Sequence, residues 1–148
     1  MILSLRGRLE TRWFLATAVA LPWTVALALL LRPGSAAPGS TVRSAAATVA
    51  VMALLGSVWE LAYHGAQQLR WDRDWPSVLV LASVTAEAGP VWLALGRLPR
   101  HWVHRAPGAS FLLLLGSAWV LMWLFAQGPM RVLFVRWRIN GGRLTCRR

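Results

Sequence analysis

Long apolar runs bounded by arginines constrain the fold more than any other feature of this sequence. The core of a bilayer is about 30 Å thick, and a helix of roughly 20 apolar residues crosses it with all its backbone hydrogen bonds made internally. The chain of 148 residues is 57% hydrophobic and contains four such runs. They cover residues 13–31, 43–64, 76–96 and 109–127. We predict an all-α integral membrane protein, with four transmembrane helices in an antiparallel bundle that forms one domain over residues 1–148.

Two of the four runs contain residues that disturb a regular helix. Pro22 lacks a backbone N–H, so it removes a helical hydrogen bond and is expected to kink the first span. The third run contains Glu87, Gly89 and Pro90, which a membrane helix tolerates when neighbouring helices satisfy the freed groups. We therefore expect irregular geometry in the first and third spans.

The amino-terminal run has an alternative interpretation as a signal peptide. Three arginines precede it, and the small residues 35–37 that follow resemble a cleavage site. The run is longer than the apolar region of most signal peptides, and Arg32 separates it from the candidate cleavage site. We expect a retained transmembrane span.

The charge distribution predicts an orientation in the membrane. The chain has 16 basic residues, all arginine, against 5 acidic ones, a net charge of +11. With four spans, the two termini and the second loop carry eleven arginines, and the other two loops carry five. The positive-inside rule then places both termini of a multi-pass cell-membrane protein in the cytoplasm.

Composition also bears on cofactors and partners. The arginines are separated by apolar runs, which argues against a nucleic-acid binder. The single cysteine, Cys146, allows no intramolecular disulfide and no cysteine-based metal site, so we predict no metal and no cofactor. The basic tail 128–148 is expected to lie in the membrane interface, with its arginines against anionic lipid headgroups.

Tryptophan and charge gather where spans are expected to meet water. Amphipathic indole rings favour the headgroup level, so interfacial anchoring is expected for the tryptophans at predicted span ends and for one in the tail. These are Trp13, Trp71, Trp75, Trp102 and Trp137. The second loop is predicted to be a salt-bridged interfacial turn; the alternative is a docking surface for a cytoplasmic partner. Its residues are Arg70, Trp71, Asp72, Arg73, Asp74 and Trp75.

Two glutamates lie within predicted spans, where a carboxylate is costly and points to a functional site. Glu60 and Glu87 are equidistant from the turn at residues 72–74. Residues equidistant from a tight antiparallel turn lie at the same height, about 15–20 Å of helix from it. We therefore predict that the two carboxyl groups can face each other, and that at least one is neutral because like charges repel away from water.

Helical spacing adds polar neighbours to both glutamates. In the second span, Gly56, Ser57, Glu60, His64 and Gln67 follow steps of three or four residues and so share one face. His64 lies one turn from Glu60, close enough to share a proton with it. On the third span, a similar face carries small and polar side chains. The candidate buried polar site therefore consists of Glu60, His64, Gln67, Ser83 and Glu87.

Three roles suit such a site. Hydrogen bonds across the hairpin can fix how the helices dock. Alternatively, the carboxyls relay protons or hold a cation, with Gly89 and Pro90 breaking the helix to expose carbonyl groups. A metal or acid–base site is the third possibility, although no recognised ligand spacing is present. We expect a structural or accessory subunit of a membrane assembly rather than an enzyme, partnered by another membrane protein or a second copy. A proton- or cation-coupled transporter or channel that uses Glu60 and Glu87 is the alternative.

Several segments carry a resemblance to a known group of proteins. The residues are Trp59-Glu60-Leu61-Ala62-Tyr63-His64, Gln67-Gln68, the run from Arg70 to Pro76, and Gly128-Pro129-Met130-Arg131-Val132-Leu133-Phe134. They resemble uncharacterised small multi-pass membrane proteins of high-GC actinobacteria, and the exclusive use of arginine fits a GC-rich genome. The resemblance implies no activity. Small multidrug-resistance exporters also have four spans, but they carry a glutamate in the first span, which this chain lacks.

Overall fold

The computed structural model describes residues 4–31, 37–69, 77–99, 101–103, 107–139 and 143–144. The described part is helical and contains no strand, which confirms the all-α prediction for these residues. The helices are α1 (Leu5–Leu15), the π-helical turn η1 (Ala16–Ala20), α2 (Leu21–Leu30), α3 (Pro38–Gln68), α4 (Ser77–Arg97), α5 (Gly108–Gln127), α6 (Pro129–Leu133) and α7 (Val135–Ile139).

The first helical segment begins earlier than the sequence predicted. It starts at Leu5 rather than near residue 13, because Ser4 caps it by accepting a hydrogen bond from the Gly7 N–H at 3.2 Å. The irregularity expected at Pro22 takes the form of η1, which directly precedes α2. A proline ring clashes with the carbonyl of a regular α-helical turn, and a π-helical turn changes that geometry.

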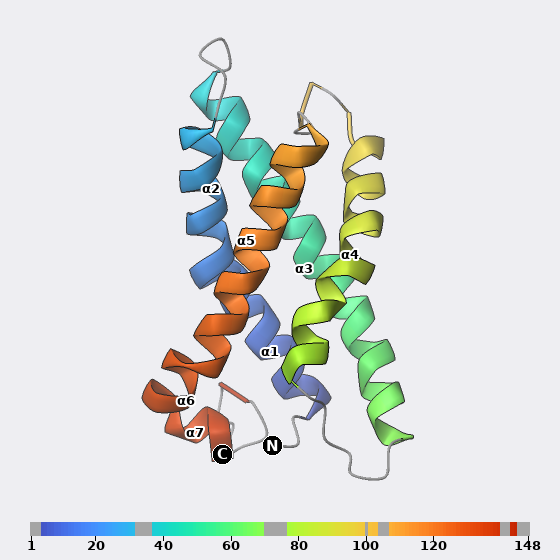
Figure 1. Ribbon diagram of the computed structural model, residues 1–148, viewed down its shortest axis with the longest axis vertical. Helices are drawn as coiled ribbons and strands as arrows, with labels where there is room; N and C mark the ends of the chain where they lie inside the picture. Colours follow the sequence, from blue (N-terminus) through green and yellow to red (C-terminus); the bar gives the residue numbers. More distant parts are fainter. Residues whose placement is uncertain are drawn as a thin grey trace.

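The long helices lie side by side along the long axis of the molecule (Figure 1). α3 contacts α1, α2 and α4, while α5 contacts α2 and α4, so the helices surround a common core. Small side chains line much of this core, among them Ala16, Ala20, Ala53 and Ala118. Small residues allow close approach of helix backbones, which is the main source of packing energy between helices in lipid.

Three helical segments of the described chain are long and apolar enough to cross a membrane. They are Leu5–Leu30, Pro38–Gln68 and Gly108–Leu133. Their outward side chains include Val58 on α3 and Leu112 on α5, which are 63% and 60% exposed. Apolar surface of this extent is typical of a protein that contacts lipid rather than water. The structure therefore supports a membrane protein.

The short helices α6 and α7 fold against α1 at the end of the molecule where both termini lie (Figure 1). Phe134 makes an edge-on contact with Phe14, with ring centroids 5.6 Å apart. The Trp137 indole N–H donates a hydrogen bond to Thr11 Oγ1 at 2.7 Å. The expectation that Trp137 anchors the tail at the headgroups is wrong, because its side chain is only 5% exposed and packs inside the protein.

Candidate functional site

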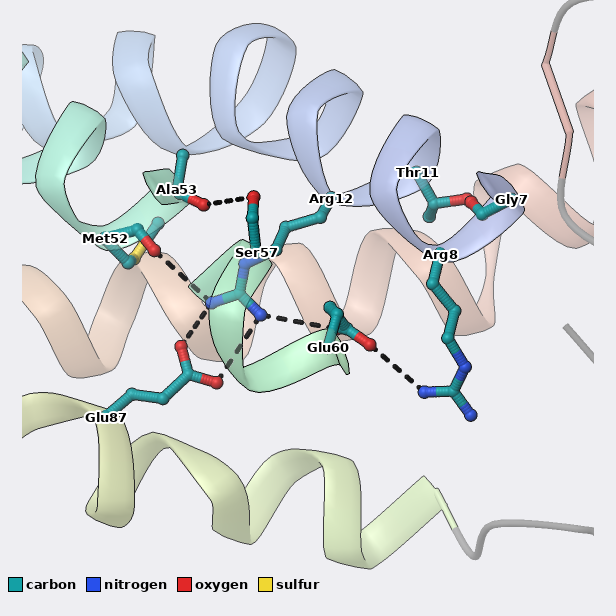
Figure 2. Close-up of polar contacts among 9 residues, drawn as sticks. All are labelled: Gly7, Arg8, Thr11, Arg12, Met52, Ala53, Ser57, Glu60 and Glu87. Atoms are coloured by element: carbon teal, nitrogen blue, oxygen red, sulfur yellow. Dashed lines mark hydrogen bonds and ion pairs between the residues drawn. The ribbon is translucent and has the colours of Figure 1, made fainter. Parts of the chain in front are cut away.

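The buried polar site is organised around an arginine that the sequence interpretation placed outside the membrane. Arg12 lies in α1, and its side chain is 5% exposed. Its guanidinium binds Glu87 of α4 through both terminal nitrogens, Nη2 to Oε2 and Nη1 to Oε1. Nη1 also binds Glu60 Oε1 of α3 at 3.3 Å (Figure 2). One cation from the first helix thus holds the two glutamates predicted to face each other.

A second arginine extends the network by one helical turn. Arg8 donates from Nη1 to Glu60 Oε2 at 3.1 Å and from Nη2 to Gln67 Oε1 at 2.7 Å. Its side chain is 9% exposed, so this end of the network is also largely buried. We call Arg8, Arg12, Glu60, Gln67 and Glu87 the arginine–glutamate cluster.

Glycine and tryptophan shape the space for the Arg12 guanidinium. A Cβ atom added at Gly56 would lie 1.6 Å from Nη2 and 1.8 Å from Cζ, so only glycine leaves room at this position of α3. The Arg12 Cζ also lies 4.9 Å from the centre of the Trp119 ring of α5, a cation–π distance. Nη2 further donates to the Met52 carbonyl of α3 at 3.4 Å. Arg12 therefore contacts all three neighbouring long helices.

The cluster is balanced in charge, with two guanidinium groups against two carboxylates. Each of the two carboxyl groups has a guanidinium in contact. Two-nitrogen arginine–carboxylate contacts are among the stronger polar interactions in proteins and fix their geometry. Removal of one partner leaves an uncompensated buried charge, which typically costs about 3–5 kcal/mol. The cluster therefore ties α1 to α3 and α4.

The remaining predicted site residues lie next to the cluster with other partners. The His64 ring contacts Gln68 on its own helix, with 3.2 Å between the two Nε2 atoms. Ser83 hydrogen-bonds the Tyr63 hydroxyl, so it links α4 to α3 separately from Glu87. Ser57 bonds back to the Ala53 carbonyl at 2.7 Å rather than across the helices (Figure 2). The predicted interfacial loop, residues 70–75, lies outside the described residues.

Sequence reasoning missed Arg8 and Arg12 as members of the site, although a signal for them exists. They are four residues apart, so they share one face of any helix that continues upstream of Trp13. Ser4 is a suitable cap for such a helix. Among the described residues, no group of three His, Cys, Asp or Glu side chains could hold a metal ion.

The fold and the cluster define a class, that of helical membrane proteins with an internal ion-pair network. Comparison with protein families, curated proteins and solved structures found no match to this chain.

Proposed function

We propose that this protein is a structural or accessory subunit of a membrane assembly, without an enzymatic activity of its own. The observation that carries the proposal is that the carboxyl groups of the buried Glu87 and the half-buried Glu60 are both paired with arginines of α1. An ion-pair network of this kind fixes helix orientation, the best-attested use of buried charge. A rigid small bundle suits a protein that supports neighbouring membrane helices.

In this proposal α4 crosses the membrane with the three segments named above, to give an antiparallel four-helix bundle. Its 21 residues extend about 31 Å at 1.5 Å per residue, enough for the bilayer core. Pairing of Glu87 with Arg12 offsets the energy needed to bury that carboxylate. Removing the buried Arg8 and Arg12 from the eleven arginines on the terminal side leaves nine against five, so both termini remain assigned to the cytoplasm of a cell membrane.

The geometry disfavours the transport alternative. A carboxylate that carries a proton or cation must be able to exchange its partner, whereas Glu87 is 1% exposed and bound through both oxygens. Arg8 and Arg12 also place two positive charges where a cation would bind. A transported cation would first have to displace a guanidinium, and burial of an unpaired arginine in lipid is costly.

The test is purification of the tagged full-length protein from its native membranes in a mild detergent, after brief cross-linking. A tagged membrane protein of the same size, expressed at the same level, serves as the control. Quantitative mass spectrometry should find a membrane-protein partner, or extra copies of the chain, at constant stoichiometry. A second arm measures proton and alkali-cation flux in proteoliposomes for the wild type and for Glu60→Gln and Glu87→Gln. Absence of a stoichiometric partner, together with a flux that either variant abolishes, would overturn the proposal in favour of a carrier.

A further inference from the structure

The helices α6 and α7 have two faces of different character. The inner face packs on the protein through Met130 and Trp137, which are 0% and 5% exposed. The outer face carries Val132, Leu133 and Ile139, which are 72–73% exposed. The hydrogen bond from Trp137 to Thr11 of α1 fixes which face is turned outward. The exposed apolar side chains therefore belong to helices that are themselves packed on the rest of the protein.

Arginines flank these apolar side chains in the sequence. Arg131 of α6 and Arg136 of α7 are both exposed. Residues 128–148 contain six arginines and no acidic residue. We call Arg131, Val132, Leu133, Arg136 and Ile139 the outer surface. A partner of the outer surface must pair with its arginines and also bury the apolar side chains next to them.

The position of the outer surface identifies one partner that meets both requirements. The candidate membrane segment Gly108–Leu133 ends at the last residue of α6, so α7 begins two residues after the end of this segment. α6 and α7 lie at the same end of the molecule as the start of α1 (Figure 1). At this depth, acyl chains adjoin headgroups, and a segment that mixes apolar and cationic side chains lies in the interface.

We propose that the outer surface binds the anionic headgroups of the adjacent lipid leaflet, with Arg131 and Arg136 at the phosphates and Val132, Leu133 and Ile139 in the acyl boundary. Charge complementarity and continuity with the membrane segment favour lipid as the partner. An acidic protein surface would pair with the arginines but would leave the apolar side chains without an apolar contact. The inference goes beyond the proposed function, since it holds whether or not the protein has a protein partner.

The experiment uses the full chain in nanodiscs of phosphatidylcholine with increasing fractions of phosphatidylglycerol. A bimane label on Ile139→Cys, in a Cys146→Ser background, reports quenching by lipid-bound nitroxide and by aqueous iodide. The test variant is Arg131→Gln/Arg136→Gln. The matched control is Arg43→Gln/Arg97→Gln, which removes two exposed arginines near the start of α3 and at the end of α4, the opposite end of the molecule (Figure 1).

Lipid quenching should rise with the fraction of phosphatidylglycerol and weaken at high salt. Each arginine near an anionic surface contributes about a fivefold preference for anionic over neutral lipid. Loss of two arginines should therefore lower the preference for phosphatidylglycerol by up to roughly 30-fold. The control should leave quenching at residue 139 unchanged. Equal quenching in both lipids, or an equal loss in the control, would overturn the inference. A label shielded from both quenchers would show that a protein or a second copy covers the surface instead.

Discussion

Replacement of Gly56 by alanine tests whether the Arg12 guanidinium occupies the position described. The new Cβ would lie 1.6 Å from Nη2, whereas real Cβ atoms essentially never approach a neighbour within 3.0 Å. The guanidinium must therefore move by about 1.4 Å, the difference between these distances. Because Glu87 and Glu60 bind the same guanidinium from α4 and α3, this shift breaks at least part of the pairing.

The expected loss follows from two opposing terms. Disruption of a buried ion pair costs about 3–5 kcal/mol, and we take about 3 kcal/mol because a flexible arginine relaxes in part. Alanine in place of glycine favours the helix by about 1 kcal/mol. Gly56→Ala should therefore lower the free energy of unfolding by about 2 kcal/mol. Titration with sodium dodecyl sulfate in mixed micelles, followed by circular dichroism and tryptophan fluorescence, measures this quantity.

The same helix provides a control. An added Cβ at Gly65 of α3 meets no heavy atom within 4 Å, so Gly65→Ala should be neutral or stabilise the protein by up to about 1 kcal/mol. In an Arg12→Gln background the clash disappears, and Gly56→Ala should behave like Gly65→Ala. If Gly56→Ala is as stable as Gly65→Ala in the wild type, or equally harmful with and without the guanidinium, the proposed position of Arg12 is refuted.

Three further predictions concern the cluster and the docked tail, and their stability changes are measured by the same unfolding titration. Arg12→Gln should destabilise by about 3–5 kcal/mol and Arg8→Gln by about 1–3 kcal/mol, since only Arg12 pairs with two carboxylates; equal effects would contradict this order. Glu60→Gln should still fold and insert, at a smaller cost than Arg12→Gln, because the amide oxygen still accepts a hydrogen bond and Glu87 stays paired with Arg12; failure to insert, or a loss larger than that of Arg12→Gln, would count against it. Trp137→Phe should cost about 1 kcal/mol by removing the bond to Thr11 and should speed hydrogen exchange in α7; unchanged exchange would show that this bond does not hold the tail.

The sequence predicted the features that follow from a single physical rule. Helical periodicity and bilayer length located the long helices, and arithmetic about the turn at residues 72–74 placed Glu60 and Glu87 at one level. That level is the one at which both bind the same guanidinium. Helical spacing also grouped Gly56 and Gln67 with Glu60, and both are buried in the structure. The reason for Gly56 could not be read from spacing, because it depends on a side chain from another helix.

The arginines were missed because charge before an apolar run has two physical outcomes. Such a residue either remains at the interface as an orientation signal or enters the membrane when an opposite charge awaits it. Arg6 is exposed, with 55% of its side chain accessible, and pairs with Glu10 on the same helix. Arg12 is buried inside the protein instead, because Glu60 and Glu87 lie within its reach. The two glutamates within the predicted spans are the signal in the sequence that a flanking arginine can be buried beside them.

Trp137 in the tail also contacts a partner inside the protein that the sequence did not reveal. Trp137 was expected to contact headgroups, yet Thr11 on α1 offers its indole N–H an acceptor inside the protein. Arg12, the neighbour of Thr11, carries the cluster between α1, α3 and α4. The helix α1 is therefore held by two sets of contacts, the ion pairs with α3 and α4 and the hydrogen bond with α7. Displacement of α1 would break both sets of contacts together, so this short helix links α7 to the buried charges.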